Sequence, residues 1–289
     1  MTLIDAHVHV WDTGRLRYPW LADVPVLTRS HLPEHIDRSA HELPGATEAP
    51  GDAGMVFVEA GCVPEQFLAE ARAASDAVWP ELRGIVAGAD LTSPDLVAHL
   101  TEVRAIPLVV GVRHNLQGLP TGALNDPAFR AGLAAVAAAE LSFDACVTRD
   151  QLPELAAFLE AGFRDSPGLR VVLDHLGKPA VDEGLDSAEG HDWAEQIRRI
   201  AALPGVAVKL SGLAPEASSP ELLTKRAPEF LRFALETFGP ERCLYGSDWP
   251  VSAKLGAGGT ALAWRALVRD AVTAVSGENM AARTAVDAG

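Results

Sequence analysis

The segment Leu3-Ile4-Asp5-Ala6-His7-Val8-His9-Val10 carries the pattern from which the fold can be worked out. Its apolar and β-branched residues predict a strand over about residues 3–10. Alternate side chains on a strand project to the same side, so His7 and His9 should aim two imidazoles at one point. Two solvated histidines on an isolated strand would explain this segment equally well, so the rest of the chain has to decide.

Seven further β-rich runs follow, separated by segments in which apolar residues recur at helical spacing. We expect these strands at about 54–60, 83–89, 107–113, 141–147, 169–175, 205–211 and 242–248. Helix starts are marked by prolines suited to the first helical position, at Pro64, Ser93-Pro94, Asp126-Pro127 and Ser219-Pro220. Gly162 and Gly239 are the expected helix stops. The alternation predicts an α/β protein, although an open, doubly wound sheet would show the same count.

The polar residues at the predicted strand ends favour a closed barrel. They are His7 and His9 on the first strand, Glu59 on the second, Arg113-His114 on the fourth, His175 on the sixth and Asp248 on the eighth. In a barrel all these ends lie on one face. We therefore predict one (β/α)8 TIM barrel domain over residues 1–289. The long loop 11–53 after the first strand should cover the active site and contain a helix near 33–43.

The net charge of the chain limits the kinds of molecule that it is expected to bind. The chain has 39 acidic and 24 basic residues and a net charge of -15, which repels nucleic acid and anionic membrane surfaces. We therefore expect a small-molecule partner, with no nucleic acid and no membrane. The three cysteines, Cys62, Cys146 and Cys243, lie in or beside apolar runs, which suits reduced thiols in the cytoplasm. No leader or membrane-spanning run is visible.

His175 and Asp248 are the main candidates besides the first two histidines. His175 ends the apolar run Val171-Val172-Leu173, beside Asp174 and Lys178. A lone buried histidine is usually structural, and Asp174 could orient an imidazole or cap a turn. Asp248 follows the apolar segment 244–246. A carboxylate buried in that position needs a partner that offsets the cost of burial, or a function. It could cap a helix, but no helical pattern begins until about residue 259, so the general-base interpretation is preferred.

The four residues His7, His9, His175 and Asp248 supply three nitrogens and one carboxylate. This set is sufficient for one Zn²⁺ with a water molecule, and too small for two ions. No organic cofactor is expected, because the Gly-rich stretch 256–261 does not directly follow a strand. The chain also lacks a Gly-x-Ser-x-Gly elbow, which removes the usual serine-hydrolase route.

Other residues are candidates for substrate contact. Arg113 and His114 could hold a carboxylate or a hydroxyl pair, although a salt bridge would explain Arg113 nearly as well. Arg113 with Lys178 would make a positive pocket. Tyr18, Trp20 and Trp249 could line a pocket of sugar size, although core packing is commoner for aromatic residues. The remaining histidines are interpreted as surface residues: His31, His35, His41, His99 and His191.

Several segments resemble one known family in the same order. They are Leu3-Ile4-Asp5-Ala6-His7-Val8-His9-Val10-Trp11-Asp12, Tyr18-Pro19-Trp20-Leu21, Gly111-Val112-Arg113-His114, Leu173-Asp174-His175-Leu176-Gly177-Lys178-Pro179, Lys209-Leu210-Ser211-Gly212-Leu213 and Tyr245-Gly246-Ser247-Asp248-Trp249-Pro250-Val251. Over nearly its whole length the chain resembles the lactonase-like branch of the amidohydrolase-2 family, which includes sugar-acid lactonases and sulfomuconolactone hydrolases. Some members hold one zinc and others work without metal.

The resemblance implies that His7, His9, His175 and Asp248 form the catalytic centre. It places Arg113, His114 and the region of Trp20 around the substrate. The expected reaction is lactone hydrolysis, in which Asp248 activates water and the histidines, or one bound metal, polarise the carbonyl. The fourth strand has no bridging lysine or glutamate, so a binuclear site is not expected. The alternatives are a metal-dependent decarboxylase of an aromatic acid and a non-catalytic barrel that binds a sugar acid.

Overall fold

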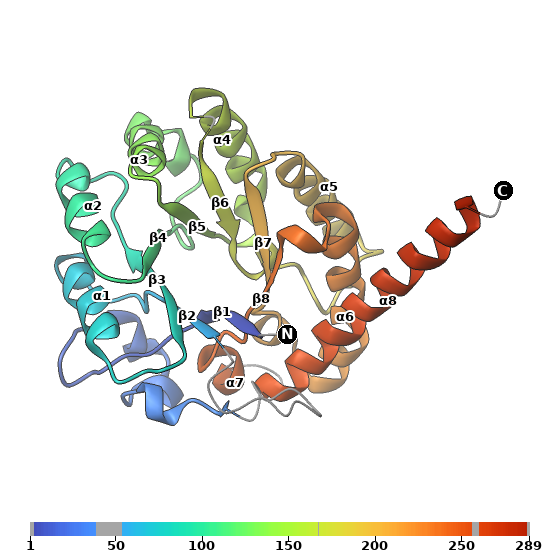
Figure 1. The fold of residues 1–289 in the computed structure, drawn as a ribbon, viewed down its shortest axis with the longest axis horizontal. Coiled ribbons are helices and arrows are strands. Elements are labelled where there is room, and N and C mark those ends of the chain that lie inside the picture. The colour runs from blue at the N-terminus through green and yellow to red at the C-terminus, as the bar shows by residue number, and fades with distance from the viewer. Residues whose placement is uncertain (1–2, 39–53, 167, 256–259, 288–289) are drawn as a thin grey trace.

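The computed structural model describes residues 3–38, 54–166, 168–255 and 260–287, and its centre is one parallel sheet of eight strands in sequential order (Figure 1). The strands are β1 Ile4–Val8, β2 Gly54–Val58, β3 Leu82–Gly88, β4 Val109–Asn115, β5 Ser142–Cys146, β6 Arg170–Leu173, β7 Val206–Leu210 and β8 Cys243–Tyr245. Each strand pairs in parallel with the next, and helices surround the ring. The (β/α)8 TIM barrel is confirmed.

The ring closes where the segment after β8 meets β1. The backbone N–H of Asp248 donates to the His7 carbonyl over 2.9 Å, and the His9 N–H donates to the Trp249 carbonyl over 2.8 Å. Val8 and Trp249 form a parallel bridge between them. Two candidate site residues, His9 and Asp248, are thus tied into the closure of the barrel through their backbones.

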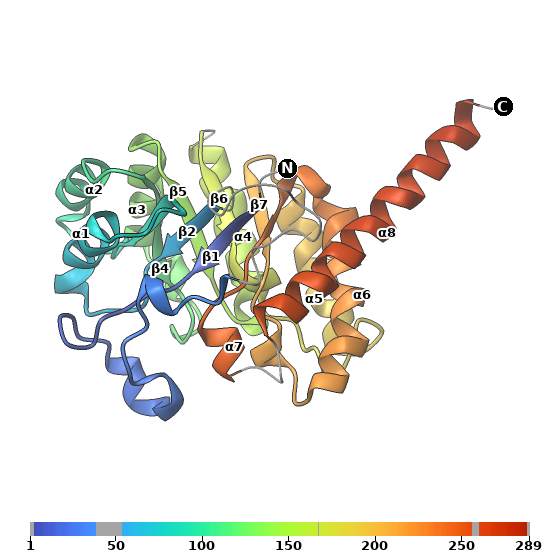
Figure 2. The same ribbon diagram turned by 60° about the horizontal axis from the view of Figure 1, so that its bottom comes forward.

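The outer layer consists of amphipathic helices whose apolar faces pack on the strands. They are α1 Phe67–Asp76, α2 Leu96–Arg104, α3 Pro127–Ala138, α4 Leu152–Asp165, α5 Ala188–Ala201 and α6 Pro220–Phe238, followed by α7 Val251–Leu255 and α8 Ala261–Asp287. Helix α8 lies beside α6 and extends beyond the barrel (Figures 1 and 2). Among the described helices, none combines the length and apolar composition that crossing a membrane requires.

Of the predicted helix starts, Pro127 and Pro220 begin α3 and α6, whereas α1 and α2 begin three and two residues after Pro64 and Pro94. Asp126 and Ser219 cap α3 and α6 by accepting hydrogen bonds from backbone N–H groups of the first turn. Gly239 ends α6, as expected. Gly162 does not end a helix, because it lies inside α4 at a point where that helix approaches α3. A Cβ there would lie 2.7 Å from Leu133 Cδ2, so this glycine serves close packing.

Two predictions about the loop segments were wrong for the residues that the structure describes. Over residues 33–38 the structure has a single 3-10 turn, Pro33–His35, in place of the expected helix near 33–43, and positions 39–43 lie outside the described residues. After β8, α7 begins at Val251, well before the helical pattern expected near residue 259. Five residues are too few to show a helical repeat in the sequence.

Candidate active site

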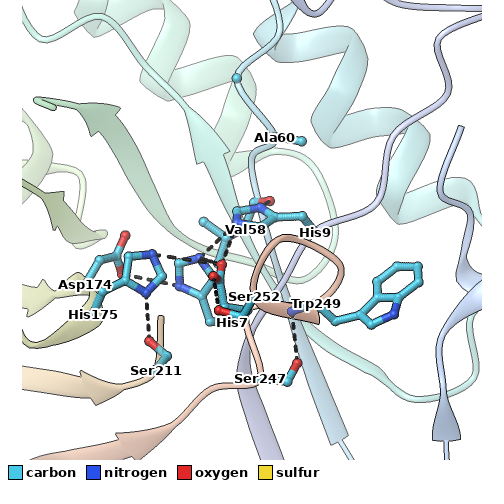
Figure 3. Close-up of polar contacts among 12 residues, drawn as sticks. His7, His9, Val58, Ala60, Asp174, His175, Ser211, Ser247, Trp249 and Ser252 are labelled. Atoms are coloured by element: carbon cyan, nitrogen blue, oxygen red, sulfur yellow. Dashed lines mark hydrogen bonds and ion pairs between the residues drawn. The ribbon is translucent and has the colours of Figure 1, made fainter. Parts of the chain in front are cut away.

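The ionisable residues at the carboxyl ends of the strands lie together at the mouth of the barrel (Figure 3). Strands β6 and β8 are shorter than predicted, and His175 and Asp248 follow the last strand residues Leu173 and Tyr245 by two and three positions. Both have positive φ, 54° and 55°, a region that side chains other than glycine rarely adopt. Such strain persists only where the surroundings impose it, and it gathers at functional sites.

Three imidazoles and one carboxylate face a common point. The Nε2 atoms of His7 and His9 are 3.0 Å apart. Asp248 Oδ1 lies 3.7 Å from Nε2 of His7, 3.5 Å from Nε2 of His9 and 4.0 Å from Nε2 of His175. All four residues are buried. The predicted cluster of His7, His9, His175 and Asp248 is therefore assembled in the structure.

Hydrogen bonds at the far ring nitrogens orient two of these imidazoles. His9 Nδ1 donates to the Val58 carbonyl over 2.8 Å, which leaves its Nε2 with a free lone pair when the ring is neutral. His175 Nδ1 lies 2.9 Å from Ser211 Oγ. Gly212 makes room for that ring, because a Cβ on it would lie 2.3 Å from His175 Nδ1. The segment 211–212 after β7 thus fixes an imidazole that comes from the end of β6.

His7 is held by a different pair of groups. Its Nδ1 lies 3.1 Å from the ammonium of Lys209 and 3.4 Å from Asp174 Oδ1. Burial and the nearby Lys209 charge lower the pKa of His7 well below its usual value. Burial also lowers the pKa of His175, to about 4. Both rings are therefore neutral near pH 7.

The groups around Asp248 favour its ionised carboxylate. Its Oδ2 accepts a hydrogen bond from Ser252 Oγ of α7 over 2.7 Å, which leaves Oδ1 directed at the imidazoles. Burial alone would raise the pKa of Asp248, but the neighbouring His175 and His9 hold it well below its usual value. Asp248 does precede a helix, as the capping interpretation required. Its side-chain contact to Ser252 does not occupy Oδ1, so both roles are compatible.

The donor set fits a divalent metal ion. Ligand atoms around a tetrahedral Zn²⁺ with bonds of 2.0–2.1 Å are about 3.3 Å apart. The separations among the Nε2 atoms and Asp248 Oδ1 bracket this value, and the ligand atoms of His7, His175 and Asp248 all lie within 4.8 Å of one another. The Nε2 atoms of His7 and His9 lie at hydrogen-bond distance from each other, so a cation held between the two rings would take the place of that contact.

A buried ionic network below the cluster was missed by sequence reasoning. The Lys209 ammonium donates to Asp144 and lies 2.9 Å from Asp174 Oδ1, with all three residues within 2% exposure. These carboxylates raise the pKa of Lys209 against the opposing effect of burial, so it stays charged. The available signal was a lysine inside the apolar run Val206–Leu210.

Arg113 belongs to the same network. Its Nε donates to Glu59 Oε1 and its Nη2 to the Glu59 carbonyl, each over 2.6 Å, and its Nη1 lies 3.4 Å from Asp174. The salt-bridge interpretation of Arg113 therefore applies in the described structure. With His114, Arg113 also lines a cavity of about 570 Å³ at the ends of β2, β3 and β4. The substrate role of both stays a prediction, and His114 Nδ1 accepts a hydrogen bond from the Leu91 N–H.

The other predicted substrate residues surround the mouth at greater distance. Trp20 Nε1 donates to the Ala60 carbonyl, and Tyr18 is buried with its ring centroid 6.4 Å from that of Trp11. Lys178 Nζ lies 2.5 Å from Gln117 Oε1 and 4.0 Å from Glu216. The indole of Trp249 points away from the histidine cluster (Figure 3).

Glu70 is a second buried carboxyl group that sequence reasoning did not single out. It accepts the Ala60 backbone N–H at 3.2 and 3.3 Å. Burial and the Glu59 carboxylate raise its pKa from 4.5 to about 8. At pH values between 4.5 and about 8, Glu70 keeps its proton in the folded protein but has lost it in the unfolded protein. The free energy of unfolding should therefore decrease as pH rises through this window.

We expect Glu70→Gln to remove this decrease, because a neutral amide keeps an acceptor for Ala60 N–H and has no proton to lose. Urea unfolding midpoints measured from pH 4.5 to about pH 8 test this expectation. Glu65→Gln, at an exposed position, is the matched control. An unchanged pH slope in Glu70→Gln would show that Glu70 ionises normally in the folded protein.

The barrel and the buried imidazoles and carboxylate at its mouth define an enzyme of the hydrolytic (β/α)8 class. The chain belongs to the amidohydrolase family, whose model matches residues 4–281. An L-fucono-1,5-lactonase of Burkholderia multivorans is 35% identical over 256 residues, covering 86% of this chain and 82% of that protein. An L-fucono-1,5-lactonase of Burkholderia ambifaria is 38% identical over 184 residues, covering 63% and 60%.

A solved structure agrees with these sequence relatives. The crystal structure of an amidohydrolase from Burkholderia multivorans with bound zinc superposes with a TM-score of 0.78 at 31% identity. The match covers 95% of this chain and 92% of that chain. The resemblance inferred from the sequence motifs is confirmed at the level of the family.

Proposed function

We propose that this chain hydrolyses a small lactone, and that a sugar-acid lactone of the L-fucono-1,5-lactone kind is the first substrate to test. The observation that carries the proposal is the position of Asp248 Oδ1, which lies within 4.0 Å of three imidazole Nε2 atoms in a buried site. The two lactonase relatives support the choice of substrate class.

Asp248 is the proposed general base. Because its pKa is held low, the carboxylate is ionised and can accept a proton from water that attacks the lactone carbonyl. The carbonyl carbon gains the water oxygen, and the electron pair moves to the carbonyl oxygen. When the ring C–O bond breaks, the proton on Asp248 passes to the ring oxygen. The product is an open-chain hydroxy acid.

The imidazoles stabilise the charge that develops on the carbonyl oxygen. His7 and His175 are neutral near pH 7, so they add no charge that would need compensation before the substrate binds. With His9 they and Asp248 would hold a zinc ion, which when bound supplies Lewis-acid polarisation of the carbonyl. Lys209 and Asp174 keep His7 in place from behind.

We further propose that the substrate extends towards Arg113 and His114 in the cavity of about 570 Å³. Lys178, Tyr18 and Trp20 would complete the surroundings of the mouth, whereas the indole of Trp249 points away from the cluster. An oxygen-rich ring suits this mixture of cationic and aromatic groups, because guanidinium and ammonium groups donate to hydroxyl oxygens.

A panel of aldonic and aromatic lactones, followed with a pH indicator, tests the proposal. Hydrolysis releases one proton for each ring opened, and we expect saturable turnover of at least one sugar-acid lactone above the rate without enzyme. Release of CO₂ from an aromatic acid, with no lactone turnover, would instead assign a decarboxylase. Binding of a sugar acid without any turnover would assign a non-catalytic barrel.

We expect protein purified without chelator to contain no more than about one equivalent of zinc per chain, because the cluster offers one set of four ligands. A second possible set, Cys146, Asp174 and His175, shares a carboxylate already paired with Lys209 and Arg113. Elemental analysis with a His9→Ala variant as control measures the site. Two equivalents would contradict the mononuclear proposal, and full activity without zinc would assign carbonyl polarisation to the histidines alone.

A further inference from the structure

Strand β3 ends differently from the strands on either side of it. Its neighbours β2 and β4 carry Glu59 and Arg113 at their carboxyl ends, whereas β3 ends in Gly88 and is followed by Ala89. A Cβ on Gly88 would lie 2.3 Å from the ring of Phe67, so the glycine lets this ring approach the end of the strand. The small residues at the end of β3 leave space at the mouth of the barrel.

That space is the cavity of about 570 Å³, and every residue that lines it belongs to the continuously described range 54–166. Its volume is typical of small-molecule sites, which span about 300–1,000 Å³. Arg113 lines the cavity and its Nη1 lies 3.4 Å from Asp174 Oδ2, while Asp174 Oδ1 lies 3.4 Å from His7 Nδ1. The cavity therefore begins two contacts away from the catalytic cluster.

The charged groups around the cavity are largely engaged within the protein. Arg113 uses three of its five N–H groups on carboxylate and carbonyl oxygens, which leaves two for the ring oxygens of a substrate. Asp90 Oδ1 accepts two hydrogen bonds from Thr92, and Asp126 caps α3. These contacts leave little charge with which the cavity could recognise an ionic group.

His114 supplies a neutral donor. Its Nδ1 accepts the Leu91 N–H over 3.1 Å, and burial lowers its pKa, so the ring is neutral and carries its proton on Nε2. Among the described residues Nε2 has no hydrogen-bond partner, and it is not an enclosed atom, so it is open to the cavity that the ring lines. The exposed amide of Asn115 adds a second donor at the rim. Two neutral donors suit one or two oxygen atoms of a ligand.

The remaining wall of the cavity is mainly apolar. Phe67 and Leu119 line it and are only half-buried, and Phe129 lies beside the His114 ring with the centroids 5.1 Å apart. Ala123 lines the same wall. Apolar side chains that keep part of their surface in water favour a ligand that covers this surface with carbon atoms.

We propose that this cavity selects lactones with an apolar substituent of several carbon atoms over fully hydroxylated lactones. The inference rests on the lactone hydrolysis proposed above and names the substrate class of that site. The ring oxygens face Arg113 and His114, and the substituent lies against Phe67 and Leu119 near the end of β3. Phe67 and Leu119 are thus specificity-determining residues, because they contact the part of the substrate that does not react.

Calorimetric titration of the full chain with sodium 5-hydroxydecanoate and, separately, with sodium gluconate tests the inference. Both are open-chain hydroxy acids of the kind that lactone hydrolysis releases, and they differ in having an alkyl or a polyhydroxyl tail. We expect the Kd of 5-hydroxydecanoate to be at least about tenfold lower, since two or three methylene groups removed from water are sufficient for this factor. Equal or tighter binding of gluconate, or no binding of either acid, would overturn the inference.

Two variants locate the preference in the cavity. Leu119→Gln introduces an amide into the wall, and Ala123→Phe fills the cavity without adding a polar group. Each should raise the Kd of 5-hydroxydecanoate by about tenfold, the reverse of the gain from burying the tail. Val97→Gln replaces an apolar side chain that is 68% exposed on α2 and does not line the cavity, so it should bind like the wild type. Wild-type binding in Ala123→Phe, or equal losses in Leu119→Gln and Val97→Gln, would show that the tail binds elsewhere.

Turnover separates this inference from the proposed function. We expect kcat/KM for δ-decalactone to exceed that for D-glucono-1,5-lactone. Hydrolysis of the glucono lactone alone would overturn the substrate class and leave lactone hydrolysis in place. If neither lactone is hydrolysed but 5-hydroxydecanoate binds and Ala123→Phe weakens its binding, the preference of the cavity stands and the proposed function is wrong.

Discussion

Asp248→Asn is expected to lower kcat for lactone hydrolysis by ~10²–10⁴-fold, the usual effect of removing a general base. The amide cannot accept the proton of the attacking water. It can still accept the hydrogen bond from Ser252 Oγ, so the fold and the turn at φ 55° should survive. Steady-state kinetics with the substrate found in the lactone panel measure the change, and thermal unfolding checks the fold.

Ser252→Ala is the matched control for this experiment. It removes the contact to Asp248 Oδ2 and leaves Oδ1 in place, so we expect a much smaller loss of kcat. Zinc content has to be measured in both variants, because Asp248 is also a possible ligand. Wild-type turnover in Asp248→Asn would exclude proton transfer to this residue, and recovery on addition of zinc would restrict its role to holding the ion.

Lys209→Met is expected to decrease the free energy of unfolding by ~3–5 kcal/mol, the range observed when one partner of a buried ion pair is removed. Methionine fills a similar volume but leaves Asp144 and Asp174 without their ammonium at the centre of the barrel. Burial already raises the pKa of Asp144 to about 6 despite Lys209. Without this lysine we expect Asp144 to be protonated at neutral pH.

The double variant Lys209→Met/Asp144→Leu separates charge from packing. Because it removes a cation and an anion together, it should be more stable than Lys209→Met alone in urea unfolding at neutral pH. Asp174 remains paired with Arg113 in this variant. If both variants unfold at the same urea concentration, the cost of Lys209→Met lies in packing and not in the unpaired carboxylate.

Local patterns in the sequence were sufficient for the architecture and for the centre of the site. Strand and helix periods depend only on neighbouring residues, so all eight strands were predicted, and their ends were displaced by at most three residues. His7, His9, His175 and Asp248 could be selected because a barrel brings the carboxyl ends of its strands to one face. The single-domain assignment stays a prediction.

Which residues pack around that centre could be learned only from the tertiary structure. In a parallel barrel both faces of a strand are buried, so an apolar run such as Val206–Leu210 does not reveal which way Lys209 points. The pairing of Lys209 with Asp144 and Asp174, and of Arg113 with Glu59, depends on the register between strands far apart in sequence. His31, predicted to be a surface residue, is buried for the same reason, because its neighbours Trp11 and Trp249 come from opposite ends of the chain.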